Sequence, residues 1–220
     1  MENKIKIIWT SSSICGPVRE VNEDTIYPEV SGTTKETFVA GVCDGLGGHK
    51  HGEVASSIAI KQLQKKFDSV LEVISSANRE ILSHQKLNPE TLGMATTMTI
   101  VYINREGLLK LGHIGDSRCY ILSDRELKQL SIDHTVDGAE NILTQAVGLT
   151  DKISPQLVDY QLSIGDVVLI CSDGFYNEVS EVYLKRKLQE GATAEALVND
   201  ILTNEPRDNV SAVIMNITKL

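Results

Sequence analysis

Three aspartates stand where a strand-like apolar run meets a loop, at widely separated places in the chain. Asp44 ends the run of residues 38–43, and Asp173 ends the run of residues 167–172. Asp208 stands shortly before the run of residues 210–215. Three such side chains can meet only if their strands are neighbours, so this pattern limits the folds that the chain can adopt. A divalent cation is the natural compensation for carboxylates that converge with no basic partner between them.

Each aspartate taken alone has an ordinary structural explanation. Asp44 begins a glycine-rich stretch, residues 44–48, and aspartates in such stretches usually serve the turn itself. Asp173 and Asp208 can be interpreted in the same way. Together the three predict a site for a hard cation, because the glycines let backbone carbonyls and water come close. If two ions bind about 3.5–4 Å apart, they can clamp a phosphoryl group and activate a water for in-line attack.

The bulk composition bounds the class of protein. The chain has 220 residues with no linker, repeat or low-complexity run, which predicts one domain over residues 1–220. Its net charge of −9 argues against a nucleic-acid or anionic-membrane surface, since both reward a basic footprint. The absence of a signal region and of a bilayer-spanning run predicts a soluble, cytoplasmic protein. The four cysteines show no CxxC spacing and are expected to be reduced thiols, mostly buried.

Hydrophobic periodicity predicts groups of strands separated by pairs of helices. Helical spacing covers residues 52–67 and 70–87, and later residues 178–189 and 193–202. Strand patterns cover residues 4–10 (as an edge strand), 25–30, 37–43, 95–103, 108–114, 118–122, 167–172 and 210–217. This order does not alternate strand and helix. It therefore predicts an α+β fold of antiparallel sheets covered by helices.

Four further charged residues are candidates for the same site. Arg19 is either a surface ion-pair partner or a planar fork for two phosphate oxygens. Glu23 and Asp24 begin a strand and could hold waters that are bound to an ion. Asp116 lies in a Gly-Asp-Ser-Arg turn between two strands, which fits a hairpin about as well as it fits a ligand.

The remaining motifs narrow the chemistry. His49 stands close to Asp44 and is either a proton donor or a plain loop residue, with the loop role slightly favoured. The sequence contains no GxSxG, HExxH or Walker P-loop motif. Acyl hydrolysis, zincin chemistry and P-loop nucleotide cleavage therefore have no support.

Several short motifs, taken in order, resemble the bacterial form of the metal-dependent serine/threonine protein phosphatases of type 2C. They are RxxNED (19–24), DGLGGHxxGExAS (44–56), ATTMT (95–99), GDSR (115–118), DH (133–134), LTQAVG (143–148), CSDG (171–174) and RDNVS (207–211). The resemblance implies a four-layer α-β-β-α sandwich, in which helix pairs flank two antiparallel sheets. It also implies hydrolysis of phosphoserine or phosphothreonine by direct attack of a water or hydroxide that bridges two metal ions.

The resemblance implies a set of metal ligands. Asp44 would bridge two manganese or magnesium ions, and the Gly45 carbonyl would bind the first of them. Asp173 and Asp208 would hold the second ion. Asp116, together with Asp173, would help to bind a third and weaker ion.

The resemblance also implies how substrate and water are held. Arg19 would bind the substrate phosphate, and Glu23 and Asp24 would orient waters on the ions. The substrate would be a phosphorylated protein, and the phosphatase would oppose a serine/threonine kinase or a switch kinase of the anti-sigma type. A monomer is expected.

The sequence departs from the family pattern in two places. Some members carry a histidine as general acid two residues after the first metal aspartate, where this chain has Leu46. The proton donor is therefore not identified by the sequence. In addition, only eight residues separate His134 from Leu143, where relatives usually carry a longer segment with a flap beside the site. We expect little or no flap, which puts substrate choice and the third ion in question.

Two other functions compete with a protein phosphatase. A pseudo-phosphatase would bind phosphorylated partners without turnover, but such a module has no need of a full set of aspartates. A phosphatase of small phosphoesters would use the same ions. Phosphate release from phosphopeptides and from small phosphoesters separates the three possibilities.

Overall fold

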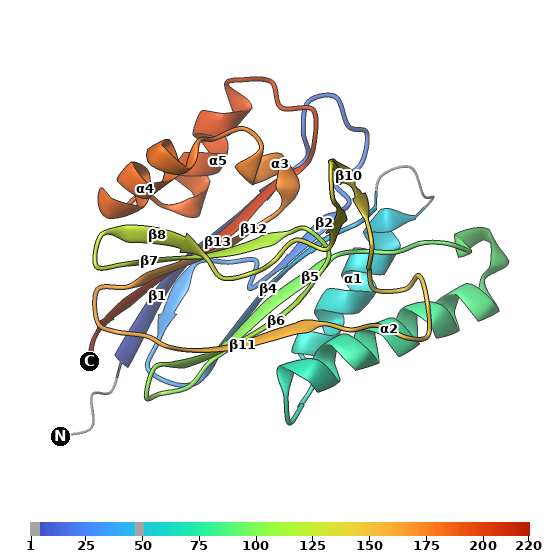
Figure 1. Cartoon of the computed structure of the whole chain (residues 1–220), viewed down its shortest axis with the longest axis horizontal. Coiled ribbons are helices and arrows are strands. Elements are labelled where there is room, and N and C mark those ends of the chain that lie inside the picture. The colour runs from blue at the N-terminus through green and yellow to red at the C-terminus, as the bar shows by residue number, and fades with distance from the viewer. Residues whose placement is uncertain (1–4, 47–50) are drawn as a thin grey trace.

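Two antiparallel sheets pack face to face and form the centre of the molecule (Figure 1). The structure is a computed structural model that describes residues 5–46 and 51–220. The six-stranded sheet has the order β3 (Gly32–Thr34), β1 (Ile5–Ile14), β13 (Val210–Lys219), β12 (Val167–Cys171), β7 (Arg118–Ser123) and β8 (Glu126–Gln129). The five-stranded sheet has the order β11 (Gln156–Gln161), β6 (Leu108–Ile114), β5 (Met98–Ile103), β4 (Phe38–Asp44) and β2 (Asp24–Tyr27).

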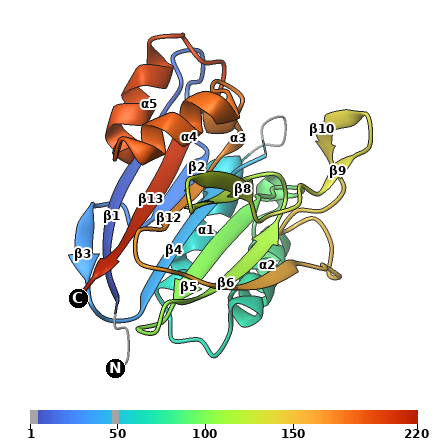
Figure 2. The same cartoon turned by 60° about the vertical axis from the view of Figure 1, so that its left-hand side comes forward.

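A pair of helices covers the outer face of each sheet (Figures 1 and 2). Helices α1 (Gly52–Leu63) and α2 (Val70–Leu87) pack on the five-stranded sheet. Helices α4 (Glu181–Gln189) and α5 (Ala194–Leu202) pack on the six-stranded sheet. Shorter elements are α3 (Asp173–Tyr176), a 3₁₀ turn (Pro89–Thr91) and the hairpin of β9 (Thr135–Val136) with β10 (Ala139–Leu143). The four-layer α-β-β-α sandwich predicted from the sequence is confirmed.

The apolar residues divide into three layers that match this architecture. One cluster fills the space between the sheets and includes Ile7, Val101, Leu111, Ile121 and Val213. The other two clusters lie between each sheet and its helix pair. Because the central strands are buried on both faces, their sequences are nearly continuous apolar runs.

Helix α2 is the element whose bounds match the sequence prediction best. Its N-cap residue Ser69 accepts a hydrogen bond from the backbone N–H of Glu72 (3.2 Å), which satisfies one of the free donors of the first turn. Residues Val73, Ile74 and Ile81 then form the buried stripe. The helix begins at Val70 and ends at Leu87, as the spacing predicts.

Two local predictions differ from the structure. Strand β1 was expected at a sheet edge, but it pairs with β13 along its whole length and is covered on its other side by the short β3. The turn that carries Asp116 does not form a hairpin. It carries the chain from β6 in one sheet to β7 in the other, because β6 pairs with β5 and β11 while β7 pairs with β12 and β8.

Within residues 5–46 and 51–220, no helix combines the length and the apolar character that a bilayer crossing requires.

Candidate active site

The first two carboxylates of the site stand side by side at one end of the five-stranded sheet. Asp24 begins β2 and Asp44 ends β4, and the two are direct partners in the antiparallel ladder. Like charges placed opposite one another on neighbouring strands destabilise a sheet. The sequence therefore builds an unfavourable pair into the end of the sheet.

The next two carboxylates come from the neighbouring end of the other sheet. Asp173 is the first residue of α3, directly after β12, and Asp208 precedes β13. Since β12 and β13 are paired, the two aspartates approach one another. Burial and then the charge of Asp208 raise the pKa of Asp173.

Asp44 and Asp173 link the two halves, because the two side chains are close enough for each to shift the pKa of the other. The Asp44 residue is partly exposed to solvent. Burial raises the pKa of Asp44 well above its usual value, and the charges of Asp24, Asp173 and Asp116 add to the rise. The three strand-end aspartates singled out in the sequence are therefore neighbours in one place.

Backbone and hydroxyl contacts fix Asp44 in position. Its N–H donates to Thr97 Oγ1 (2.9 Å), and its carbonyl accepts from the Thr96 hydroxyl (2.8 Å) and the Thr97 N–H (2.8 Å). Thr97 Oγ1 in turn contacts Ser117 Oγ at 2.6 Å, next to Asp116. These threonines, which the sequence analysis did not place in the site, support its central carboxylate.

Asp24 has the most unusual environment of the group. It is buried, and neither of its carboxylate oxygens has a hydrogen-bond partner of good geometry among the described residues. Burial raises the pKa of Asp24 to about 7, although the nearby hydroxyls of Ser172 and Ser211 act in the opposite direction. Ser211 Oγ donates its proton to Ser13 Oγ (2.8 Å), whereas Ser172 Oγ accepts from the Ser211 N–H (3.1 Å) and keeps its own proton to donate.

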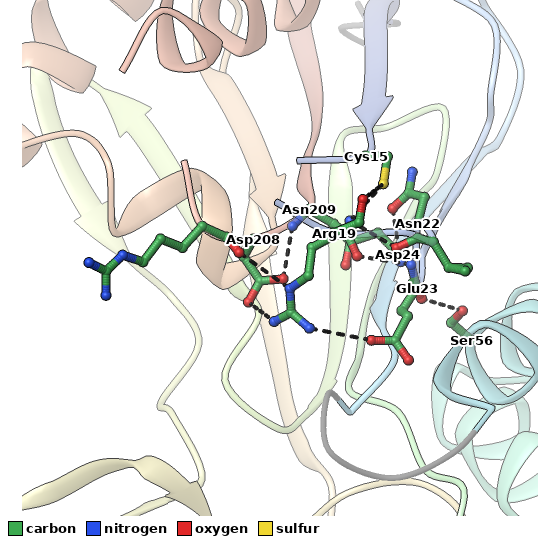
Figure 3. Close-up of polar contacts among 10 residues, drawn as sticks. Cys15, Arg19, Asn22, Glu23, Asp24, Ser56, Asp208 and Asn209 are labelled. Carbon is green, nitrogen blue, oxygen red and sulfur yellow. Dashed lines mark hydrogen bonds and ion pairs between the residues drawn. The ribbon is translucent and has the colours of Figure 1, made fainter. Parts of the chain in front are cut away.

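The guanidinium of Arg19 lies between the carboxylates of Asp208 and Glu23 (Figure 3). Its Nη2 donates to Asp208 Oδ2 at 2.7 Å, its Nε donates to the Arg207 carbonyl at 3.3 Å, and its Nη1 is 3.7 Å from Glu23 Oε2. The expectation that no basic group stands among the aspartates is therefore wrong for Asp208. A guanidinium that faces the carboxylates can also meet an anion that arrives there.

Glu23 is held from three sides. Its backbone carbonyl accepts hydrogen bonds from Ser56 Oγ (2.6 Å) and from the Gly45 N–H (3.1 Å), and its N–H donates to Asn209 Oδ1 (2.9 Å). Burial raises the pKa of Glu23, while the charge of Arg19 lowers it in part. Gly45 itself forms an isolated β-bridge with Thr96, which fixes the position of its backbone.

Asp116 lies beside Asp173 at the edge of a cleft of about 590 Å³. Burial and then the charge of Asp173 raise the pKa of Asp116 to about 7. The cleft is lined by Asp116, Arg118, Asp133, Gly138, Ala139, Asp173, Tyr176 and Asn177. Its far wall belongs to the β9–β10 hairpin, which occupies the place where the sequence predicts little or no flap.

The second guanidinium of the cleft is already used inside the protein. Arg118 donates to Asp133 Oδ2 through Nε (2.9 Å) and Nη2 (2.8 Å), and to the Tyr120 hydroxyl through Nη1 (3.0 Å). Its other contact is the ring of Tyr176, whose centroid lies 3.7 Å away. Arg118 therefore shapes the wall, whereas Arg19 faces the carboxylates.

The sequence candidate for a proton donor, His49, lies outside the described residues. Leu46 is described, and its N–H donates to the Ala95 carbonyl (3.0 Å), but its side chain has no proton to give.

The donor set fits a hard divalent cation. Within the described part of the chain, no three acidic, histidine or cysteine side chains enclose a common point closely enough to form a cage. Magnesium-like ions do not require one, because they keep several waters and use one or two carboxylates. Neither oxygen of Asp24 has a partner of good geometry in the described part of the chain, and burial with neighbouring carboxylates raises the pKa values of Asp44 and Asp173, so a positive charge placed here would stabilise the ionised forms.

Comparisons with known proteins bear on the family. The model of the Protein phosphatase 2C family matches residues 18–206. The serine/threonine protein phosphatase PstP of Mycobacterium tuberculosis is 30% identical over 95% of this chain, and the chain spans 45% of that relative's length. The protein phosphatase PhpP of Streptococcus pneumoniae is 31% identical over 75% of this chain and 77% of its own.

A solved structure resembles the whole fold. It is the catalytic domain of a PstP phosphatase in complex with two manganese ions, with a TM-score of 0.85 and 28% identity. The match covers 98% of this chain and 100% of that one.

Proposed function

Since the chain belongs to the protein phosphatase 2C family, we propose that it hydrolyses phosphoserine and phosphothreonine in proteins with the help of two divalent cations. The observation that carries the proposal is the meeting of Asp24, Asp44, Asp173 and Asp208 at adjoining ends of two sheets. Buried carboxylates that raise one another's pKa are stabilised by positive charge. Manganese or magnesium would supply that charge.

Each carboxylate takes a separate role in this proposal. Asp44, at the centre of the group, would bridge the two ions, and the Gly45 carbonyl would bind the first. Asp173 and Asp208 would hold the second. When bound, the ions would neutralise the phosphate and supply a water of lowered pKa as the nucleophile, with the serine or threonine oxygen as the leaving group. Asp116, beside Asp173, would help to hold a third and weaker ion.

The other residues orient water and substrate. Asp24 is buried, and neither of its oxygens has a partner of good geometry within residues 5–46 and 51–220, so it can accept hydrogen bonds from waters on the ions; Glu23 can do the same. Arg19 would bind the phosphate. One of its planar donors already binds Asp208, and two oxygens of a phosphate would offer the guanidinium a bidentate contact.

The partners and setting follow from the same proposal. The substrate would be a phosphorylated protein whose kinase modifies serine or threonine. We propose a monomer with one domain over residues 1–220, since one apolar cluster is shared by both sheets. We also propose a cytoplasmic location, because the four cysteines are free and three of them are buried, as is usual in a reducing compartment.

A metal-dependent phosphatase assay tests the proposal. The purified protein is incubated with a panel of phosphoserine and phosphothreonine peptides, with Mn²⁺, with Mg²⁺ and with EDTA, and phosphate release is measured. We expect release that requires the cation and a higher kcat/KM for phosphopeptides than for p-nitrophenyl phosphate. Peptide binding without release would identify a pseudo-phosphatase. A preference for the small ester would identify a phosphatase of small molecules.

A further inference from the structure

One buried amide, that of Asn209, joins the start of β13 to the segment that carries Arg19 and Glu23 (Figure 3). Its Oδ1 accepts from the Glu23 N–H (2.9 Å), and its Nδ2 donates to the Val21 carbonyl (3.2 Å). Nδ2 also lies 3.6 Å from Cys15 Sγ. A single side chain thus uses both its donor and its acceptor on one stretch of backbone.

The backbone under this amide is clamped by two glycines. A Cβ on Gly16 would stand 2.1 Å from the Asp208 carbonyl oxygen, and a Cβ on Gly174 would stand 2.1 Å from the Asn209 carbonyl oxygen. Residues 208–209 therefore lie pressed between the segment that leads to Arg19 and the first turn of α3. Asn209 is held on a rigid base, and its N–H donates to Asp208 Oδ1 (2.8 Å) as well.

The segment that the amide contacts makes few backbone hydrogen bonds within itself, and its end is also held at the Glu23 carbonyl by Ser56 and Gly45. Residues 15–23, between β1 and β2, form neither helix nor strand. Its internal backbone bond is that from the Arg19 N–H to the Gly16 carbonyl (3.0 Å). Where such a loop carries a charged side chain, the position of that side chain depends on whatever anchors the backbone.

We propose that Asn209 is a positioning residue whose amide sets the 21–23 backbone, so that Arg19 and Glu23 face Asp208 in one arrangement. Asn209 touches neither phosphate nor ion in this role. Its importance for turnover rests on the function proposed above, whereas the geometry that it sets does not. The amide is required because the site needs a donor for Val21 and an acceptor for Glu23 at once.

An aspartate cannot replace this amide. The carboxylate of Asn209→Asp would still accept from the Glu23 N–H, but it would face the Val21 carbonyl with no donor. It would also add a negative charge next to Asp208, whose own charge already raises the pKa of Asp173. Asn209→Asp and Asn209→Ala therefore remove different parts of the same contact.

Asn78 provides a matched control. It is as buried as Asn209, at 3% exposed. Its Oδ1 accepts from the Gly148 N–H (2.8 Å) and its Nδ2 donates to the Thr150 carbonyl (2.9 Å), far from Arg19 in the chain and on α2. Asn78→Ala removes the same two kinds of bond from another loop, so it reports what the loss of a buried amide does in general.

The experiment compares wild type, Asn209→Ala, Asn209→Asp and Asn78→Ala. Three quantities are measured: kcat and KM on a phosphopeptide with Mn²⁺, the Kd for Mn²⁺ by calorimetric titration, and hydrogen exchange of the backbone amides of residues 15–24. Asn209→Ala should raise KM and the Mn²⁺ Kd about tenfold and speed exchange at Glu23. Asn209→Asp should raise KM through the lost donor to Val21 but keep exchange at Glu23 slow, because its carboxylate still accepts from that N–H. Asn78→Ala should leave these three quantities within about twofold of wild type.

Two outcomes would overturn the inference. One is an Asn209→Ala protein whose KM, Mn²⁺ Kd and exchange match those of Asn78→Ala. The other is slow exchange at Glu23 in Asn209→Ala, because the amide would then not hold that backbone. If Asn209→Ala does not fold, Asn209→Asp tests the donor half of the contact, and a KM equal to that of Asn78→Ala would overturn the inference. If wild type released no phosphate, the proposed function would fail, and exchange would still decide this inference.

Discussion

Two regions of this protein bury polar side chains, and they differ in whether those side chains have hydrogen-bond partners. On α2, Gln85 Nε2 donates to the Met94 (3.1 Å) and Gly148 (2.8 Å) carbonyls, while its Oε1 accepts from the Gly93 N–H (2.9 Å). At the strand ends, Asp24 is equally enclosed, yet neither of its oxygens has a partner of good geometry among the described residues.

The difference separates a contact that serves folding from one that serves binding. A buried polar group with all its partners contributes modestly to stability, but one left without partners lowers it by about 1–3 kcal/mol, and more when charged. The buried amides of α2 therefore hold the neighbouring loop backbone without a large loss in the free energy of folding. The strand-end carboxylates keep an unfavourable concentration of charge, which a divalent cation would offset.

The largest expected effect comes from removing the central carboxylate. Asp44→Asn should lower kcat/KM on a phosphopeptide by about 10³-fold or more, since it removes the group proposed to bridge both ions. In EDTA, the same variant should unfold at a higher temperature than wild type, because one of several mutually repelling buried charges is gone.

Asp159→Asn is the control for this variant. Asp159 lies on the edge strand β11, where its exposed side chain pairs with Lys110 of β6. Its substitution should leave turnover unchanged. Full activity in Asp44→Asn would contradict the assignment of the site. A large loss of stability in EDTA would instead show that Asp44 serves folding, as the α2 amides do.

The next effect is on stability through binding. Mn²⁺ at about 100 times its Kd should raise the free energy of unfolding of wild type by about 2.7 kcal/mol, because the ion binds the folded chain. Asn78→Ala should gain as much as wild type, whereas Asp173→Asn should gain much less. Thermal unfolding with and without Mn²⁺ measures this, and an equal gain in Asp173→Asn would place the ion elsewhere.

The α2 amide contact gives the third prediction. Asn78→Ala should lower the free energy of unfolding by about 2 kcal/mol, because the Gly148 N–H and the Thr150 carbonyl lose their buried partner. Its kcat should stay at the wild-type value under conditions where the variant is folded. Denaturant unfolding and the phosphopeptide assay check both parts. A large fall in kcat in the folded variant would show that the two regions are coupled.

The smallest expected effect concerns Arg19. Arg19→Ala should raise KM about tenfold, or about 1.4 kcal/mol, with a smaller change in kcat, since it removes phosphate binding rather than the attacking water. Arg105→Ala is its control. Arg105 lies in the β5–β6 turn and pairs with the exposed Glu36, which precedes β4. An unchanged KM in Arg19→Ala would remove Arg19 from the phosphate site.

Much of the fold and part of the site could be predicted from the sequence. The bounds of α2 follow from its apolar stripe and its cap, which are features of neighbouring residues. The central strands follow from apolar runs, and the aspartates at their ends mark the candidate ligands. The hairpin β9–β10, the edge strands β8 and β11 and the short α3 carried too few periodic residues to be predicted.

Residues that support the site could not be found in this way. In the sequence, Asn209 is simply part of a loop motif before a strand, and Thr97 is part of the start of a buried strand. Their roles depend on partners such as Glu23, which lies 186 positions away in the chain. A polar residue that bonds across such a separation leaves no periodic signal in its own neighbourhood.

The sequence by itself determined the long helices and the central strands and which of those strands end in a carboxylate, because both are set by residues a few positions apart. Only the tertiary structure decided that β13 lies between β1 and β12, which brings Asp208 to Arg19 and Asp173. It also decided that the Asp116 turn crosses from one sheet to the other. Those outcomes depend on strand pairings between distant parts of the chain, which form only when both faces of each sheet are buried together.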